Sequence, residues 1–257
     1  MSIFRFRVFK EYLLQDFRLW AEYPLNFGIS LFWAIFGLIV VYFFWILVFD
    51  KATVQGYDIY KIVFYYFFVD CLFYNVMFVR PIQRVIINGD IIKNLVRKIR
   101  FEEYLFYKII SNFCVWHIVP IFALLVAGTY FLGVSAILGL LIFCFGLLIG
   151  VLIYSIIVSL SFWTGENWTI ALLLDEIIIF FAGNAIPLDL FPSWLYLIAT
   201  DYLPFNLMFF VPAKVFLGDM AITWALIGKY LIWIVALYLI LRFMVKMGLK
   251  RYEQLGG

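Results

Sequence analysis

The chain has 257 residues, of which 67% are hydrophobic, 22% aromatic and only 14% charged. Soluble domains average about 45–50% apolar and about 25% charged residues, and a soluble fold of this length could not bury so much apolar surface. The composition therefore predicts an integral membrane protein. The net charge of +3, without basic runs interleaved with polar residues, gives no sign of a nucleic-acid partner.

The first 24 residues alternate basic and aromatic side chains. The basic positions are Arg5, Arg7, Lys10 and Arg18, and the aromatic ones are Phe4, Phe6, Phe9, Phe17 and Trp20. We expect residues 1–24 to form an amphipathic helix in the membrane interface before the chain turns at Pro24. A simple basic anchor fits the same residues equally well.

Six apolar runs follow, each long enough to cross a bilayer. A hydrocarbon core about 30 Å thick needs roughly 20 apolar residues in one helix. The runs are 25–49, 60–79, 107–132, 135–162, 168–186 and 223–245. They predict an all-α membrane protein of six transmembrane helices that form a single transmembrane domain over residues 1–257.

The stretch 187–222, between the fifth and sixth runs, is apolar but interrupted by prolines. These are Pro187, Pro192, Pro204 and Pro212. Proline removes a backbone donor and clashes with the preceding helical turn, so we expect short helical pieces rather than another span. Broken backbone at membrane depth needs protein or water to satisfy it, which favours a re-entrant pair of half-helices that enters from one face.

Lysine and arginine positions give the orientation. Most of the 19 basic residues lie in the N-terminal segment, in the loop after the second span and at the C-terminus. With six spans these three regions share one face, which is cytoplasmic by the positive-inside rule. We therefore expect a multi-pass protein of the cell (cytoplasmic) membrane with both termini in the cytoplasm.

The loop at 85–105 contains the most polar stretch of the chain, residues 88–98. Gly89 can end the helix that leaves the membrane, and Asp90 stands where an N-cap would begin a new one. Aliphatic residues then recur at helical spacing between basic ones; they include Ile91, Leu95 and Val96, with Arg97 among the basic residues. The apolar side of such a helix fits either the lipid surface or a groove on a cytosolic partner, and the residues alone do not choose.

Three acidic residues lie inside apolar runs: Asp70 in the second, and Asp175 and Glu176 in the fifth. A charge at the bilayer centre is costly, so such residues face a partner or a wet cavity. They are candidates for the translocation path, and the alternative is that each is paired for helix packing. Adjacent helical positions diverge by about 100°, so Asp175 and Glu176 do not readily face the same surface.

Two further features concern helix packing. His117, the only histidine, is interpreted as a hydrogen-bonded contact between helices, and the chain offers no catalytic or metal site. Gly146 and Gly150 form a G-x-x-x-G pair, with Gly139 seven residues before Gly146. This spacing permits close helix approach, either at a dimer interface or inside one subunit.

Four stretches, in order, resemble the permease subunits of type-2 ABC exporters. They are Gly89-Asp90-Ile91 with Leu95-Val96-Arg97; Phe162-Trp163-Thr164; Gly183 with Ile186-Pro187-Leu188, Phe191-Pro192, Leu203-Pro204-Phe205, Pro212 and Gly218; and Gly248-Leu249-Lys250-Arg251-Tyr252, closing on Gly256-Gly257. Two positions depart from the family pattern, which often has an acidic residue at Ile92 and a proline at Lys98.

This resemblance implies a six-span permease that pairs with a second permease, identical or related, and receives two cytosolic nucleotide-binding subunits. The loop at 85–105 would dock into those subunits as the coupling helix. The stretch 187–222, including Phe205, would be an extracytoplasmic re-entrant pair that shapes the exit. The chain contains no G-x-x-x-x-G-K-[ST] phosphate loop, so we expect no cofactor on it, no enzyme activity by itself, and ATP with magnesium on the partner ATPase.

Two other functions compete with this one. An ion- or proton-coupled carrier could use Asp70, Asp175 and Glu176 as relay groups, but we see no internal repeat of the kind common in carriers. A membrane-embedded lipid enzyme would need acid, base or metal ligands gathered at one depth, and the chain offers one histidine and scattered carboxylates. The cargo of an exporter is not identified by the sequence.

Overall fold

A computed structural model describes residues 6–22, 24–51, 56–73, 80–88, 100–165 and 168–254. These residues form helices and short connections and no strand, which confirms the all-α class. In chain order the elements are α1 (Phe6–Glu22), α2 (Pro24–Lys51), α3 (Ile59–Leu72), α4 (Arg80–Ile87), α6 (Phe101–Leu132), α7 (Val134–Ser159), α8 (Ser161–Thr164), α9 (Trp168–Phe181), η2 (Leu188–Leu190), α10 (Ser193–Leu197), η3 (Ile198–Tyr202), η4 (Phe205–Leu207), α11 (Phe210–Phe216) and α12 (Trp224–Gln254).

Within the described residues, three helical segments are long and apolar enough to cross a membrane. They are Phe101–Leu132, Val134–Thr164, which joins α7 to α8, and Trp224–Arg251. They correspond to the third, fourth and sixth predicted spans. The first two form a hairpin at Gly133, whose φ of 68° ends α6 in a conformation that suits glycine.

The remaining predicted spans are represented by α2, α3 and α9. Helix α2 has 28 residues, and its stretch Phe36–Phe49 is apolar. Helices α3 and α9 have 14 residues each, or about 21 Å at 1.5 Å per residue, which is less than the hydrocarbon thickness. Six spans therefore stay a prediction.

Two predicted boundaries were wrong for a physical reason. The apolar run at 60–79 continues past Leu72, but α3 ends there because Phe73 adopts an extended conformation. The carbonyl of Phe73 lies 2.9 Å from Nε2 of His117 on α6, and Nδ1 of His117 lies 2.9 Å from the carbonyl of Phe113. This confirms His117 as a hydrogen-bonded contact between helices. In the same way α9 ends at Phe181, five residues before the end of the predicted run.

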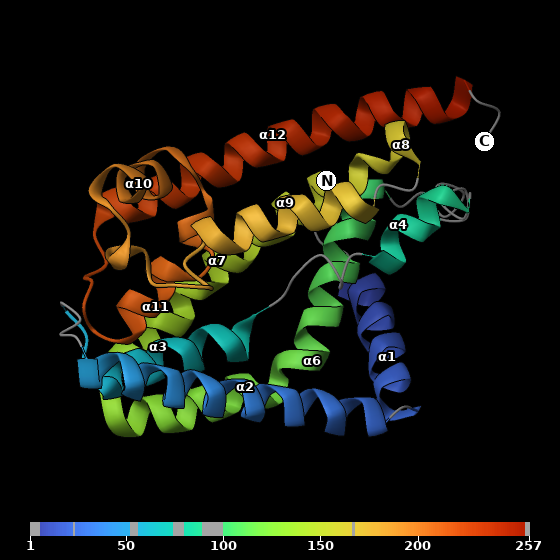
Figure 1. Cartoon of the computed structure of the whole chain (residues 1–257). Helices are drawn as coiled ribbons and strands as arrows, with labels where there is room; N and C mark the ends of the chain where they lie inside the picture. The colour runs from blue at the N-terminus through green and yellow to red at the C-terminus, as the bar shows by residue number, and fades with distance from the viewer. Residues whose placement is uncertain are drawn as a thin grey trace.

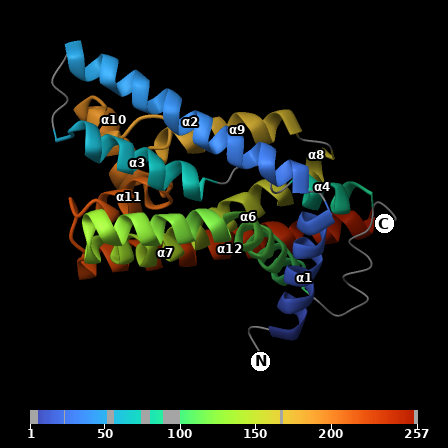
Figure 2. The ribbon, with the colours of Figure 1, turned by 90° about the horizontal axis from the view of Figure 1, so that it is seen from below.

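Most of the long helices run roughly along one direction, and the short elements gather at the two ends. One end holds α4, α8 and the last turns of α12, and the other holds α10, α11, the end of α2 and the start of α3 (Figures 1 and 2). Helix α1 crosses this direction near the α4/α8 end (Figure 2). We refer to these as the α4/α8 end and the α10/α11 end.

Helix α1 packs on α6 through one face. Asp16 is only 5% exposed, forms an ion pair with Lys108 and accepts a hydrogen bond from Ser111. On the same face the ring of Tyr12 contacts that of Tyr104 at 5.8 Å. The opposite face is exposed and carries basic residues, namely Arg7, Lys10 and Arg18. The predicted N-terminal amphipathic helix is thus present, and the two polar contacts of Asp16 fix it to α6.

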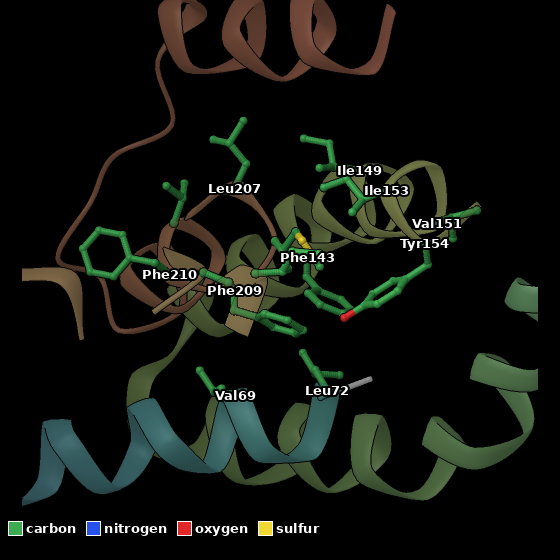
Figure 3. Packing of buried hydrophobic residues seen from close by; sticks show 14 of the residues in the cluster. Val69, Leu72, Phe143, Ile149, Val151, Ile153, Tyr154, Leu207, Phe209 and Phe210 are labelled. Carbon is green, nitrogen blue, oxygen red and sulfur yellow. The ribbon is translucent and has the colours of Figure 1, made fainter. Parts of the chain in front are cut away.

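The core lies where α3, α7 and the segment η4–α11 meet (Figure 3). The ring of Phe68 on α3 lies 4.8 Å from that of Phe216 on α11, and Phe143 of α7 lies 6.2 Å from Phe209. Because lipid tails are as apolar as leucine, hydrophobicity alone does not hold helices together in a membrane. Close packing and internal hydrogen bonds must do so, and both converge on this region.

Candidate functional site: the bent helix pair

The segments Ser193–Tyr202 and Phe205–Phe216 form a helix pair bent by 75°, which we call the bent pair. The four prolines explain its broken course. Pro187, Pro192 and Pro204 each directly precede a helical piece, and Pro212 lies in the first turn of α11. At these positions a missing N–H costs little, whereas it would interrupt a continuous helix. The prediction of short helical pieces in 187–222 is confirmed.

Helix α3 contacts the chain that leads into the bent pair. Tyr65 donates a hydrogen bond to the carbonyl of Gly183, and Tyr66 donates one of 2.9 Å to the carbonyl of Ala185. Gly183 has a φ of 78°, so the chain turns at once after α9. The carbonyls of Gly183 and Ala185 no longer take part in helical hydrogen bonds, and the two tyrosine hydroxyls donate to them instead.

Helix α7 approaches the bent pair through its glycines. A Cβ at Gly146 would lie 2.6 Å from the carbonyl oxygen of Leu207 and 2.8 Å from that of Met208, and one at Gly139 would lie 2.6 Å from the backbone nitrogen of Phe216. No side chain fits in these positions. Gly139 and Gly146 therefore serve close approach inside one subunit, which decides between the two alternatives that the sequence leaves open for them.

Helix α12 contacts the bent pair with two polar side chains. Tyr230, which is buried, donates a 2.9 Å hydrogen bond to the carbonyl of Leu207. Lys229 donates to the carbonyl of Thr200, which also accepts a 3.5 Å hydrogen bond from Nδ2 of Asn206. Thr200 lies in η3, a π-helical turn in which the regular hydrogen-bond ladder is changed. Side chains again bind carbonyls of irregular backbone.

A group of four charged side chains and one tyrosine connects α11 with the start of α3. We call it the α11 ionic cluster; its members are Tyr57, Lys61, Asp189, Lys214 and Asp219. Burial raises the pKa of Tyr57 above its ordinary value, and the charge of Asp189 raises it further, so Tyr57 stays a donor. Burial opposes ionisation of Asp219, but hydrogen bonds and charges from Lys61 and Lys214 outweigh it and hold the pKa of Asp219 below its ordinary value.

Beside the bent pair lies an open cavity of about 560 Å³. Its lining combines carboxylates, hydroxyls and aromatic rings: Asp189, Phe191, Ser193, Tyr196, Leu197, Thr200 and Asp201. Among the residues that the structure describes, no group of three or more histidine, cysteine or acidic side chains is placed to hold a metal ion.

The three predicted pathway residues have different surroundings. Asp175 is 4% exposed, and its Oδ1 accepts a 2.7 Å hydrogen bond from Tyr154 of α7. Glu176 is exposed on another side of α9, as the 100° divergence predicts. Asp70 is half-buried in the last turn of α3, and its carboxylate forms no hydrogen bond or ion pair with any described residue. Asp175 thus has a packing contact, while the carboxylate of Asp70 has none among the described residues.

The predicted coupling residues Gly89, Asp90, Ile91, Leu95, Val96 and Arg97 lie outside the described residues. The segments on either side of them are described. Ile82 and Ile86 of α4 are buried, and the ring of Phe101, at the start of α6, lies 5.5 Å from that of Phe162. A Cβ at Gly248 of α12 would overlap the Phe162 ring. The segments that precede and follow these residues, α4 and the start of α6, are therefore both packed within the α4/α8 end of the fold.

Sequence reasoning missed most of the polar contacts of the bent pair. Tyr65, Tyr66 and Tyr230 look like ordinary aromatics in apolar runs, and Lys61 and Lys214 like isolated charges. The one signal in the sequence was the presence of lysines in apolar stretches. Lys214 and Lys229 lie in such surroundings, where a lysine needs a partner. Which partner each one has could not be read from the sequence.

Comparison with known proteins agrees with this architecture. No curated protein and no solved structure matches the chain significantly. A family model described as "ABC-2 family transporter protein" matches residues 35–256, which cover the bent pair and every long helix except α1 and the first part of α2. The chain is therefore a multi-pass membrane protein that belongs to the ABC-2 transporter family.

Proposed function

We propose that this chain is the membrane-spanning permease of an ATP-binding cassette exporter, and that it moves its cargo outward by alternating access. The observation that carries the proposal is the family match over residues 35–256. Members of such a family work with an ABC ATPase subunit, and this chain has no phosphate loop of its own. ATP and magnesium would bind to that separate cytosolic subunit, and a second permease, identical or related, would complete the transporter.

The polar loop at 85–105 is the proposed docking site for the ATPase. The packing around it supports this role, because α4 precedes it and Phe101 follows it, and both contact neighbouring elements. A displacement at Phe101, which follows the loop, would reach α12 through the contact of Phe101 with Phe162 and the close approach of Phe162 to Gly248. Alternating access requires such rigid transmission between elements.

The bent pair is the proposed re-entrant element at the extracytoplasmic exit of a six-span permease. In this orientation the α4/α8 end, with α1 and the last turns of α12, faces the cytoplasm. The support comes from the distribution of basic residues and from the position of the bent pair at the opposite end (Figures 1 and 2).

Asp70 is the proposed polar residue of the translocation path, because its half-buried carboxylate has no partner among the described residues. Glu176 is exposed on α9. We propose that it faces either the second permease or the translocation path, because either position would keep its charge away from lipid. Asp175 has Tyr154 as a partner and fits a packing role in α9.

The proposal is tested by purifying the chain together with the ATPase that is encoded beside it. We expect the two to co-purify, and we expect the complex to be lost when residues 89–100 are replaced by a Gly/Ser linker of equal length. The matched control neutralises Lys246 and Lys250, which are exposed basic residues of α12, and should keep the complex. Absence of any association with the ATPase contradicts the proposal, and uptake into vesicles driven by a proton gradient without ATP would favour a carrier instead.

A further inference from the structure

Lys214 lies between the two halves of a charged network. Its side chain is 12% exposed, and Nζ lies 2.9 Å from Oδ2 of Asp189 and 3.1 Å from Oδ2 of Asp219. Asp189 belongs to η2, which follows α9, and Asp219 belongs to the turn that follows α11. One ammonium group thus binds the chain before the bent pair and the chain after it.

The same two carboxylates are bound by the start of α3. Lys61 lies 2.6 Å from Oδ1 of Asp219, and the hydroxyl of Tyr57 donates a 2.8 Å hydrogen bond to Asp189. Lys214 also lies 4.7 Å from the centre of the Tyr57 ring, a cation–π distance. Residues separated by more than 130 positions in the sequence are therefore joined by direct contacts.

The charges of the α11 ionic cluster balance, since it contains two lysines and two aspartates. Surface ion pairs contribute little because water and salt screen them, but the ammonium of Lys214 is mostly shielded from solvent. Without it, the carboxylates of Asp189 and Asp219 would lose their shared counter-ion. Removing Lys214 therefore takes away an attraction and leaves a repulsion between the chain segments at the two ends of the bent pair.

We propose that Lys214 is a positioning residue that holds the bent pair against the outer end of α3, and that the exit opens only when the α11 ionic cluster separates. The second part rests on the proposed exporter function, which makes the bent pair the exit element. The tyrosine contacts of α3 bind the chain at Gly183 and Ala185, whereas Lys214 is the cluster member that lies within the bent pair itself. Its loss should change the position of the bent pair and not only its stability.

The experiment measures the distance between α3 and α10 in the purified full-length chain in lipid nanodiscs. Spin labels are attached to cysteines that replace Tyr60 and Ser193, both exposed, after the three native cysteines have been replaced. Pulsed electron paramagnetic resonance then gives the distance distribution. We expect one narrow population in the parent chain and at least about a tenfold increase of a longer-distance population in Lys214→Met.

Two control variants and one substitute variant make the result decisive. Lys214→Arg keeps the charge and should keep the narrow distribution, and Lys246→Met removes a lysine at the opposite end and should change nothing. If Lys214→Met does not fold, Asp219→Asn replaces it, because it weakens the contacts to both Lys61 and Lys214. A lower melting temperature with an unchanged distance distribution means a purely stabilising contact and overturns the proposal.

This test is independent of the proposed function. It needs neither the ATPase nor the cargo, so an unchanged distance distribution would leave the exporter assignment intact. Conversely, failure of the chain to bind an ATPase would leave the positioning role of Lys214 standing and remove only its interpretation as part of an exit.

Discussion

Replacement of Gly146 by alanine tests the packing of the bent pair most directly. The new methyl group would lie 2.6 Å from the Leu207 carbonyl oxygen and 2.8 Å from that of Met208, and both atoms belong to the backbone and cannot rotate away. Overpacking of this kind costs about 1–3 kcal/mol, and we take about 3 kcal/mol because the overlap is with backbone. Alanine gains about 1 kcal/mol over glycine in helix propensity. The expected net destabilisation is about 2 kcal/mol.

The measurement is the thermal unfolding midpoint of the purified chain in detergent, followed by intrinsic fluorescence. A loss of about 2 kcal/mol corresponds to a fall of about 4–8 °C for a chain of this size class. The control is Gly228→Ala in α12, where a Cβ meets no atom within 4 Å, so helix propensity should leave its midpoint unchanged or raise it. Equal midpoints for the two variants would refute the reasoning, because they would mean that α7 does not approach the bent pair closely.

Three further changes probe other contacts. Tyr154→Phe removes one hydrogen bond from the buried carboxylate of Asp175 and should cost about 1–3 kcal/mol in the same unfolding assay; a change below about 0.5 kcal/mol would argue against that contact. Asp16→Asn removes the charge that binds α1 to α6 and should make α1 more susceptible to limited proteolysis, whereas Glu11→Gln on the exposed face should not. The lowered pKa of Asp219 means that its contribution is present above the ordinary aspartate pKa and is lost as the pH falls through the folded-state value; Asp219→Asn should abolish that acid-dependent loss of stability, and an identical pH profile for the variant would contradict the ion pairs.

The amino-acid composition and the positions of the prolines predict much of the fold. The all-α class follows from the apolar runs, and the short pieces at 187–222 follow from four prolines. The N-terminal helix follows from alternating basic and aromatic residues, although its contact through Asp16 does not, because a sequence pattern shows which face is polar and not what it touches. The sequence also predicts the polar loop at 85–105 as a docking site, but the central residues of this loop lie outside the described ones.

Helix length was the least predictable feature. Hydropathy measures how well side chains tolerate lipid, and the runs 60–79 and 168–186 meet that test throughout. A helix also needs each backbone carbonyl to accept a hydrogen bond from the N–H group four residues later. Helices α3 and α9 end where carbonyls contact side chains of other helices instead. The carbonyl of Phe73 lies 2.9 Å from a ring nitrogen of His117, and after α9 two carbonyls accept hydrogen bonds from tyrosines of α3.

The same rule connects the candidate site to the membrane. Backbone that leaves a helix at membrane depth must find donors within the protein, because lipid offers none. The bent pair and the chain before it receive such donors from two helices: Tyr65 and Tyr66 come from α3, and Lys229 and Tyr230 come from α12. A movement of the bent pair must break these bonds or carry both helices with it. Since α12 also reaches the α4/α8 end, where Gly248 contacts Phe162, a displacement there and a displacement of the bent pair act on one continuous helix.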